Sequence, residues 1–437
     1  MKKIKIGEKN VVIVSPGEIF VSKDPSQMLA ATLGSCVGLA LYDRINKIGG
    51  LIHVVFPRSL SKSEEVASLC AENAVDRLLN EMMKSGVKKD AIVAGICGGF
   101  NLGLSVLDDS AVESIKIIKN NLKEQKIPIQ YLEPIEHLSK FFVLDINNGI
   151  FTCRDIFLDQ ITEGKENELN KNIEDLLSKV KPIPSIVMKI LDLISREGYQ
   201  ITEIVEQIKK DEVMTARLLK FSNSPVFSPL KKIDSLEKAV IFLGSRNLLN
   251  TILSVFMEDF FDDCEGYSLQ SKGMYNHVLS VAIIAQKICD QIGLPKDVGY
   301  TCGLLHDIGK RVLEYNLCNN KRMYYKEIIK GRDSIDVEKE LFGFDHCEIG
   351  YVIGRKWNFP ENILNVIKNH HKVTIDMDSI VKVIYIANVI SYHLLPGFVI
   401  GGHSSGNFEE IMKSLNLTYT HLNTIMETFP FNTIANE

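Results

Sequence analysis

A cysteine and a histidine near the N-terminus lie in surroundings that suit nucleophilic catalysis. Cys36 follows the small residues Gly34-Ser35 and comes directly before the apolar run Val37–Tyr42, so its backbone is approachable. His53 lies after a turn at Arg44–Lys47, and an antiparallel return of the chain would bring its imidazole beside the cysteine. Because a neighbouring imidazole promotes thiolate formation and acts as a general acid and base, this spacing predicts a thiol nucleophile with a histidine base.

Backbone amides beside the cysteine would supply the second part of such a site. N–H groups in a turn that contains glycine can converge on an oxyanion, and here the candidates are those of Ser35 and Cys36. A lone cysteine in an apolar segment is more often a small buried residue, and a histidine within LIHVVF is more often part of the core. The residues alone leave both interpretations open.

Histidines and aspartates also gather in the second half of the chain: His277, His306-Asp307, His346 and His370-His371. A His-Asp doublet, joined by a histidine from an earlier helix and an acid from a later one, gives the nitrogen and oxygen ligands that hydrolytic metals accept. The alternative is that these histidines form hydrogen bonds across packed helices.

The elements that would position the cysteine and the histidine belong to an α+β domain. Short β-rich runs alternate with glycine turns, which predicts strands at Val11–Val14, Val37–Tyr42, Gly50–Phe56, Ile92–Ile96, Ile127–Tyr131 and Phe141–Leu144. Between Glu64 and Met83 apolar residues recur at helical spacing, which predicts one helix. We expect this domain to span residues 1–158.

A polar and charged stretch, residues 159–172, is typical of a linker, and an all-α domain is expected over 173–437. Helical periodicity predicts helices at Ile183–Ile194, Ile201–Lys210, Val213–Asn223, Ser235–Leu243, Asn247–Phe256, Tyr275–Ile292, Gly299–Glu314, Cys347–Trp357, Glu361–His370, Ser379–His393 and, after a loop at 397–405, Phe408–Phe429.

Composition limits the class of protein. A formal charge of −5 gives no broad basic surface, so nucleic acid is not an expected partner. The chain has no apolar run long enough for a membrane span and no signal peptide, which predicts a cytoplasmic protein without membrane insertion. Nine cysteines, an odd number without any C-x-x-C, argue against a disulfide framework and against a structural zinc site.

The run LGSCVGLALYD, followed by KIGGLIHVVFP, resembles the signature of the chemoreceptor glutamine deamidases, the CheD family. The segments NAVDRLLNEMMKSGV and ICGGFN, with Gly98-Gly99 and Asn101, extend the likeness over about residues 5–155. The resemblance implies that Cys36 is the nucleophile and His53 its base. The family's third catalytic residue, a threonine shortly before the cysteine, would fall near Ala30-Ala31, and Thr32 is the nearest threonine.

This resemblance implies hydrolysis of a glutamine side-chain amide without a metal or organic cofactor. The thiolate of Cys36 would attack the carboxamide, His53 would protonate the departing ammonia, and a water activated by His53 would hydrolyse the thioester to leave glutamate. The stretch YLEPIEHLSKFF differs from the family's pattern, so the surface that contacts the receptor is expected to differ from that of other family members.

The helical half resembles the HDOD domain, a relative of the HD phosphohydrolases, in the segments IPSIVMKIL, KKDEVMTARLLKFSNSPVF, GLLHDIGK, FGFDHCEIG and RKWNFPENILNVIKNHH. The likeness implies that His277, His306 and Asp307 match the metal ligands of HD enzymes. Asn388 stands where those enzymes have a late acid, and it is a poorer ligand for a hard divalent ion. The G-Y-P motif of cyclic-di-GMP phosphodiesterases is absent after His371.

Together these features predict a glutamine deamidase that acts on methyl-accepting chemotaxis receptors and carries a non-catalytic, regulatory HDOD module. A chemotaxis phosphatase or another signalling protein is a further expected partner, and a divalent metal at the HD-like site is left open. Two alternatives remain: a scaffold that has lost deamidase activity, and a metal-dependent HD phosphodiesterase, which would need the acid that Asn388 does not provide.

Overall fold

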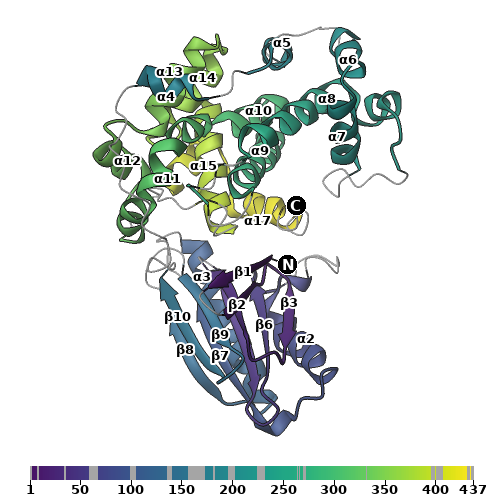
Figure 1. Ribbon diagram of the computed structural model, residues 1–437, viewed down its shortest axis with the longest axis vertical. Coiled ribbons are helices and arrows are strands. Elements are labelled where there is room, and N and C mark those ends of the chain that lie inside the picture. Colours follow the sequence, from purple (N-terminus) through teal and green to yellow (C-terminus); the bar gives the residue numbers. More distant parts are fainter. Residues whose placement is uncertain are drawn as a thin grey trace.

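The structure of the protein is a computed structural model. It describes residues 2–6, 9–33, 36–58, 67–98, 105–134, 140–155, 173–180, 183–194, 202–223, 232–262, 264, 266–268, 272–330, 332–394, 399, 407–430 and 434. The expected linker 159–172 lies outside these residues. Figure 1 shows a half built on strands and a half built of helices, which confirms the α+β and all-α parts.

The N-terminal half contains two five-stranded sheets. In the first sheet the strands follow the order β1 (Lys2–Ile6), β2 (Lys9–Ile13), β4 (Gln27–Leu33), β9 (Lys140–Asp145) and β10 (Ile150–Asp155). In the second sheet they follow the order β3 (Ile19–Ser22), β6 (Ile48–Val54), β5 (Val37–Asp43), β7 (Ile92–Gly98) and β8 (Ile129–Pro134).

The second sheet is the middle layer of this half, because its two faces pack against different partners. Alternate residues of β5, Leu39 and Leu41, belong to the same core cluster as Leu78 of helix α2 (Ala71–Met83). On the opposite face, Ala40 and Tyr42 cluster with residues of the first sheet. Helix α3 (Ser105–Glu124) packs beside α2, and η1 (Lys89–Ala91) is a single 3₁₀ turn.

Glycines on the inner face of the second sheet let the first sheet come close. A Cβ at Gly38 would lie 2.7 Å from the Phe142 ring, and a Cβ at Gly95 would lie 2.5 Å from the ring of Phe151. Since both distances are shorter than real contacts allow, glycine is required where these large side chains cross between the sheets.

The helical half is built from α4 to α17 (Figure 1): α4 (Ile173–Ser178), α5 (Ser185–Ile194), α6 (Thr202–Lys209), α7 (Glu212–Ser222), α8 (Leu236–Phe260), α9 (Gly273–Ile292), α10 (Lys296–Leu305), α11 (Ile308–Ile329), α12 (Ser334–Phe342), α13 (His346–Lys356), α14 (Glu361–Asn369), α15 (Ser379–Leu394), α16 (Phe408–Ser414) and α17 (Tyr419–Glu427).

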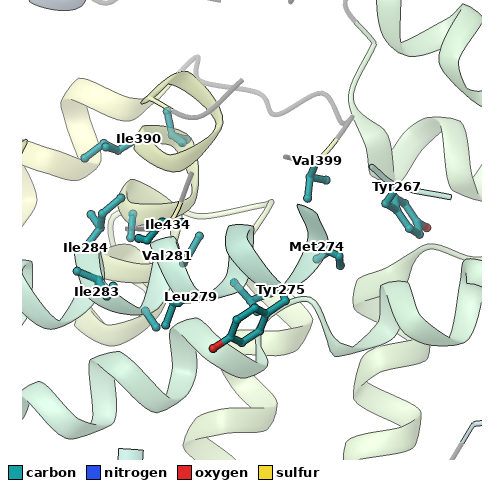
Figure 2. Packing of buried hydrophobic residues seen from close by; sticks show 14 of the residues in the cluster. Tyr267, Met274, Tyr275, Leu279, Val281, Ile283, Ile284, Ile390, Val399 and Ile434 are labelled. Atoms are coloured by element: carbon teal, nitrogen blue, oxygen red, sulfur yellow. The ribbon is translucent and has the colours of Figure 1, made fainter. Parts of the chain in front are cut away.

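Helix α9 lies at the centre of this half and is buried along most of its length. Figure 2 shows Tyr275, Leu279 and Ile283 of α9 in one packed cluster with Ile390 of α15. A helix that is apolar nearly all round belongs in a core, and α9 contacts both α10 and α15.

Several sequence-based boundaries were wrong. The predicted helix Gly299–Glu314 is two helices, because Asp307 has non-helical dihedrals (φ −99°, ψ 17°) between α10 and α11. The predicted segment Phe408–Phe429 is likewise α16 and α17, with Asn416 at φ 55° between them. The helix predicted from Glu64 is described only as α2, and residues 59–66 lie outside the described part.

Other elements were not predicted at all. Strand β4 was missed because it is buried over most of its length and lacks the alternation of polar and apolar residues that marks a half-exposed strand. Helices α3, α4 and α12 and strands β1, β3 and β10 were also missed. These additions complete the two sheets without changing the fold class.

Among the described residues no single helix is both long and apolar enough to cross a membrane. One bent pair, Leu236–Gly244 with Asn247–Phe260, passes on length and composition, but it is bent by 118°.

Candidate functional site

Strand register brings Cys36 and His53 to the same face of the second sheet. His53 on β6 pairs with Gly38 on β5, and Cys36 lies two residues before Gly38, next to the first residue of that strand. Residues two apart share a face, so the two side chains are diagonal neighbours, a separation of about 7–8 Å between Cα atoms in an antiparallel pair. Both are almost completely buried, at 1% and 2% exposure, and face the first sheet.

The imidazole of His53 is held by the main chain of the residue that directly follows β2. Its Nδ1 lies 3.3 Å from the carbonyl oxygen of Val14, so Nδ1 carries the proton and donates it to that carbonyl. Nε2 therefore carries the lone pair, and it has no hydrogen-bond partner among the described residues. Burial lowers the pKa of His53 to about 4, which keeps the ring neutral at pH 7.

Thr32, the threonine offered by the resemblance, lies on β4 of the first sheet, where it is buried and pairs with Phe141. The acceptor found at Nδ1 of His53 is instead the Val14 carbonyl. A main-chain carbonyl has no sequence signature, so this group could not be found from residue types. Val14 is itself fixed to strand β4, because its N–H donates to the carbonyl oxygen of Ala30 at 2.8 Å.

The backbone around Cys36 is tightly constrained by Gly98 at the end of β7. A Cβ at Gly98 would lie 2.3 Å from the carbonyl oxygen of Cys36, and φ is +134° there, so the position requires glycine. Gly34-Ser35, Gly99 and Asn101 lie outside the described residues, so the predicted oxyanion N–H of Ser35 stays a prediction.

A second cluster of polar side chains lies in the core of the helical half, around the carboxylate of Asp307. Oδ2 lies 3.3 Å from Nε2 of His277 and 3.2 Å from Nε2 of His306, and Oδ1 lies 3.3 Å from His346 and 3.4 Å from His370. All five residues are buried. The three residues predicted from the resemblance, His277, His306 and Asp307, therefore come together, and packing of α13 and α14 adds two further histidines.

The outer nitrogens of three of these histidines face acceptors. Nδ1 of His306 lies 2.7 Å from the Gly303 carbonyl, and Nδ1 of His346 lies 2.6 Å from the Glu338 carboxylate. Nδ1 of His370 lies 3.0 Å from the carbonyl of Ile367. Because a carbonyl or carboxylate oxygen accepts at each Nδ1, each Nδ1 carries a proton, and Nε2 of each ring points toward Asp307. Burial opposes a charge on His346, but the Glu338 carboxylate raises its pKa above the usual value, so this ring faces Asp307 as a protonated imidazolium.

Lone pairs directed at a carboxylate repel it unless a cation lies between them. Burial lowers the pKa of His277 to about 4 and that of His370 to about 3, so both rings are neutral at pH 7 and the lone pair of His370 faces the carboxylate. Nε2 of His277, His306 and His346 and Oδ1 of Asp307 all lack hydrogen-bond partners within the described part of the chain. This convergent donor set fits a divalent metal ion.

Two buried residues beside this cluster affect its charge and its supply of metal ligands. Asn388, at the position of the late acid, is fully buried, and neither atom of its amide has a hydrogen-bond partner in the described residues. Lys310 is also fully buried, and its Nζ lies 2.7 Å from Oδ2 of Asp307 and 2.9 Å from the Tyr392 hydroxyl. A positive charge is therefore already present beside the carboxylate.

Comparisons with known proteins address the two halves separately. A family model described as the HDOD domain matches residues 180–373. Over 155 residues the chain is 36% identical to a "probable chemoreceptor glutamine deamidase CheD" of Clostridium botulinum, a match that covers 34% of this chain and 90% of that protein.

A comparison with solved structures matches the following two chains, among others. A putative signal transduction protein from Marinobacter aquaeolei VT8 has a TM-score of 0.50 at 15% identity, covering 75% of this chain and 72% of that one. An HDOD domain protein of unknown function from Geobacter sulfurreducens has a TM-score of 0.46 at 23% identity, covering 61% and 94%. The sequence matches alone lead to one assignment: the chain belongs to the CheD family of chemoreceptor glutamine deamidases, and an HDOD domain follows its CheD region.

Proposed function

We propose that the sheet half hydrolyses glutamine side-chain amides in methyl-accepting chemotaxis receptors, with Cys36 as nucleophile and His53 as its acid and base. The observation that carries the proposal is the arrangement of His53, which shares a face with Cys36, donates from Nδ1 to the Val14 carbonyl and keeps Nε2 available. A base oriented by a third group is the arrangement that activates a nucleophile.

The reaction follows from these groups. Nε2 of His53 removes the proton of the Cys36 thiol, and the sulfur attacks the carboxamide carbon of glutamine. The resulting imidazolium returns the proton to the departing ammonia, leaving a thioester, and a water deprotonated by the same nitrogen hydrolyses the thioester to glutamate. No cofactor takes part in these steps.

In this proposal the Val14 carbonyl orients the His53 ring, a role for which the sequence had offered Thr32. Thr32→Ala then keeps most of the activity, because the hydrogen bond at Nδ1 of His53 comes from the main chain. A loss comparable to that of His53→Ala would contradict this assignment and return the role to the threonine.

The direct test is ammonia release, with mass-spectrometric mapping, when the full chain meets a receptor cytoplasmic fragment. A gain of roughly one dalton at defined glutamines is expected for the wild type and for Cys318→Ala, a control at an exposed cysteine, but not for Cys36→Ala or His53→Ala. Binding to several receptors without ammonia release would reject the enzyme and favour the scaffold.

The helical half is proposed as a regulatory HDOD module, and its buried histidine cluster favours a second candidate role, the binding of a divalent metal. His277, His306, Asp307, His346 and His370 would hold the ion. Such an ion supplies a Lewis acid that can polarise a phosphate ester or a water.

Metal analysis tests this second role without any assay of activity. Purified wild type is expected to retain a stoichiometric divalent metal, whereas His306→Ala, which removes a ring at the centre of the cluster, loses it. His421→Ala, on α17, is the control for loss of an imidazole. An equally low metal content in all three proteins would leave the histidines as structural residues.

A further inference from the structure

Two cysteines from opposite sheets meet beside the Cys36 and His53 pair. The sulfur of Cys97, on β7, lies 2.9 Å from the sulfur of Cys153, on β10. Cys97 is buried, and Cys153 is partly exposed. A disulfide has its sulfurs about 2.05 Å apart, so a movement of about 1 Å would bring these two into bonding distance.

The pair lies in the same row of residues as the proposed base. On the second sheet, Gly38 is flanked by His53 on one side and by Cys97 on the other. On the first sheet, Cys153 pairs with Phe142, the residue whose ring packs over Gly38. The two sulfurs therefore meet between the sheets at β7, and only strand β5 separates them from His53 on β6.

We propose that Cys97 and Cys153 are a redox modification site, which a small-molecule disulfide converts into a reversible cross-link between the two sheets. The thiolate of Cys153 attacks the small disulfide and releases one thiol. The thiolate of Cys97 then displaces the second thiol from the mixed disulfide, so that two protein thiols are oxidised and one small disulfide is reduced to two thiols.

The cross-link acts on the nucleophile through Gly98, the residue after Cys97. Its backbone packs so closely on Cys36 that an added Cβ would lie 2.3 Å from the Cys36 carbonyl oxygen. A disulfide that pulls Cys97 toward the first sheet therefore also moves the Gly98 backbone that packs against Cys36.

Access to Cys36 decides the functional consequence, which rests on the proposed deamidase function. Cys36 is 1% exposed and lies between the sheets, so a substrate amide reaches its sulfur only when this part of the two sheets opens. A covalent bond between the same sheets opposes that opening. The oxidised protein is therefore the closed and less reactive form.

The test uses the full chain, treated with glutathione disulfide and then labelled with iodoacetamide for peptide mapping. We expect a linked peptide pair carrying Cys97 and Cys153, and a rise of about 5–10 °C in the melting temperature of the sheet half. Alkylation of Cys36 is expected to slow about tenfold and to recover after dithiothreitol. Cys153→Ala loses all three effects, and Cys318→Ala, at the exposed cysteine, keeps them.

The possible results separate the parts of the proposal. Absence of the linked peptide under conditions that glutathionylate Cys318 overturns the modification site. A linked peptide with unchanged alkylation of Cys36, or slowed alkylation that persists in Cys153→Ala, overturns the control of access. No receptor is present in these measurements, so they remain decisive even if the deamidase assay fails.

Discussion

The neutral, buried state of His53 makes the stability of the sheet half depend on pH. The pKa of His53 is about 4 in the folded protein, because burial disfavours the charged ring, against 6.5 for an ordinary histidine. Between these two values the unfolded chain binds a proton that the folded chain does not bind, so stability falls as the pH falls below 6.5. Lowering the pH from 7 to 5 should cost about 2 kcal/mol of unfolding free energy through this residue alone.

Comparison of wild type with His53→Gln isolates that contribution, because glutamine can donate to the Val14 carbonyl but does not titrate. Urea unfolding at pH 7 and pH 5 would be followed by hydrogen exchange of peptides from β5 and β6, since the single tryptophan, Trp357, lies in the helical half. His421→Gln on α17 controls for loss of an imidazole elsewhere. Equal pH dependence in wild type and His53→Gln would refute a neutral, buried His53.

Three further substitutions test the packing and the metal cluster. Gly98→Ala should destabilise the sheet half by at least about 2 kcal/mol in urea unfolding, because its Cβ would strike the carbonyl oxygen of Cys36 at a strained φ; an unchanged midpoint would contradict this contact. Phe142→Ala removes a fully buried ring between the sheets and should cost about 3–5 kcal/mol in the same measurement, whereas a loss below 1 kcal/mol would show that the sheets close over the gap. Glu338→Gln weakens the acceptor that orients His346 and should lower zinc affinity by about 10–100-fold in a chelator competition, an effect absent if the cluster does not bind metal.

The sequence predicted the approach of Cys36 and His53 better than it predicted their surroundings. The turn at Arg44–Lys47 implied a hairpin, and a hairpin of that length does place Cys36 and His53 on one face. The orienting group could not be predicted, because the Val14 carbonyl reaches His53 only through the packing of two sheets whose strands alternate along the chain.

In the helical half the sequence revealed the ligand types but not their convergence. The doublet His306-Asp307 was expected within one continuous helix, whereas the break between α10 and α11 occurs at these residues. His346 and His370 were recognised only as members of a histidine-rich set. Their approach to Asp307 depends on how α13 and α14 pack against the helices around it, which no local pattern encodes.

Lys310 gives the helical half a charge balance that does not depend on an added ion. Its ammonium group, fully buried at 2.7 Å from the Asp307 carboxylate, compensates that carboxylate within the core. Small domains that borrow their charge compensation from a metal unfold when a chelator removes it. If the cluster binds metal as proposed, a chelator is expected to remove the ion while the helices stay folded, because Lys310 already balances the buried carboxylate.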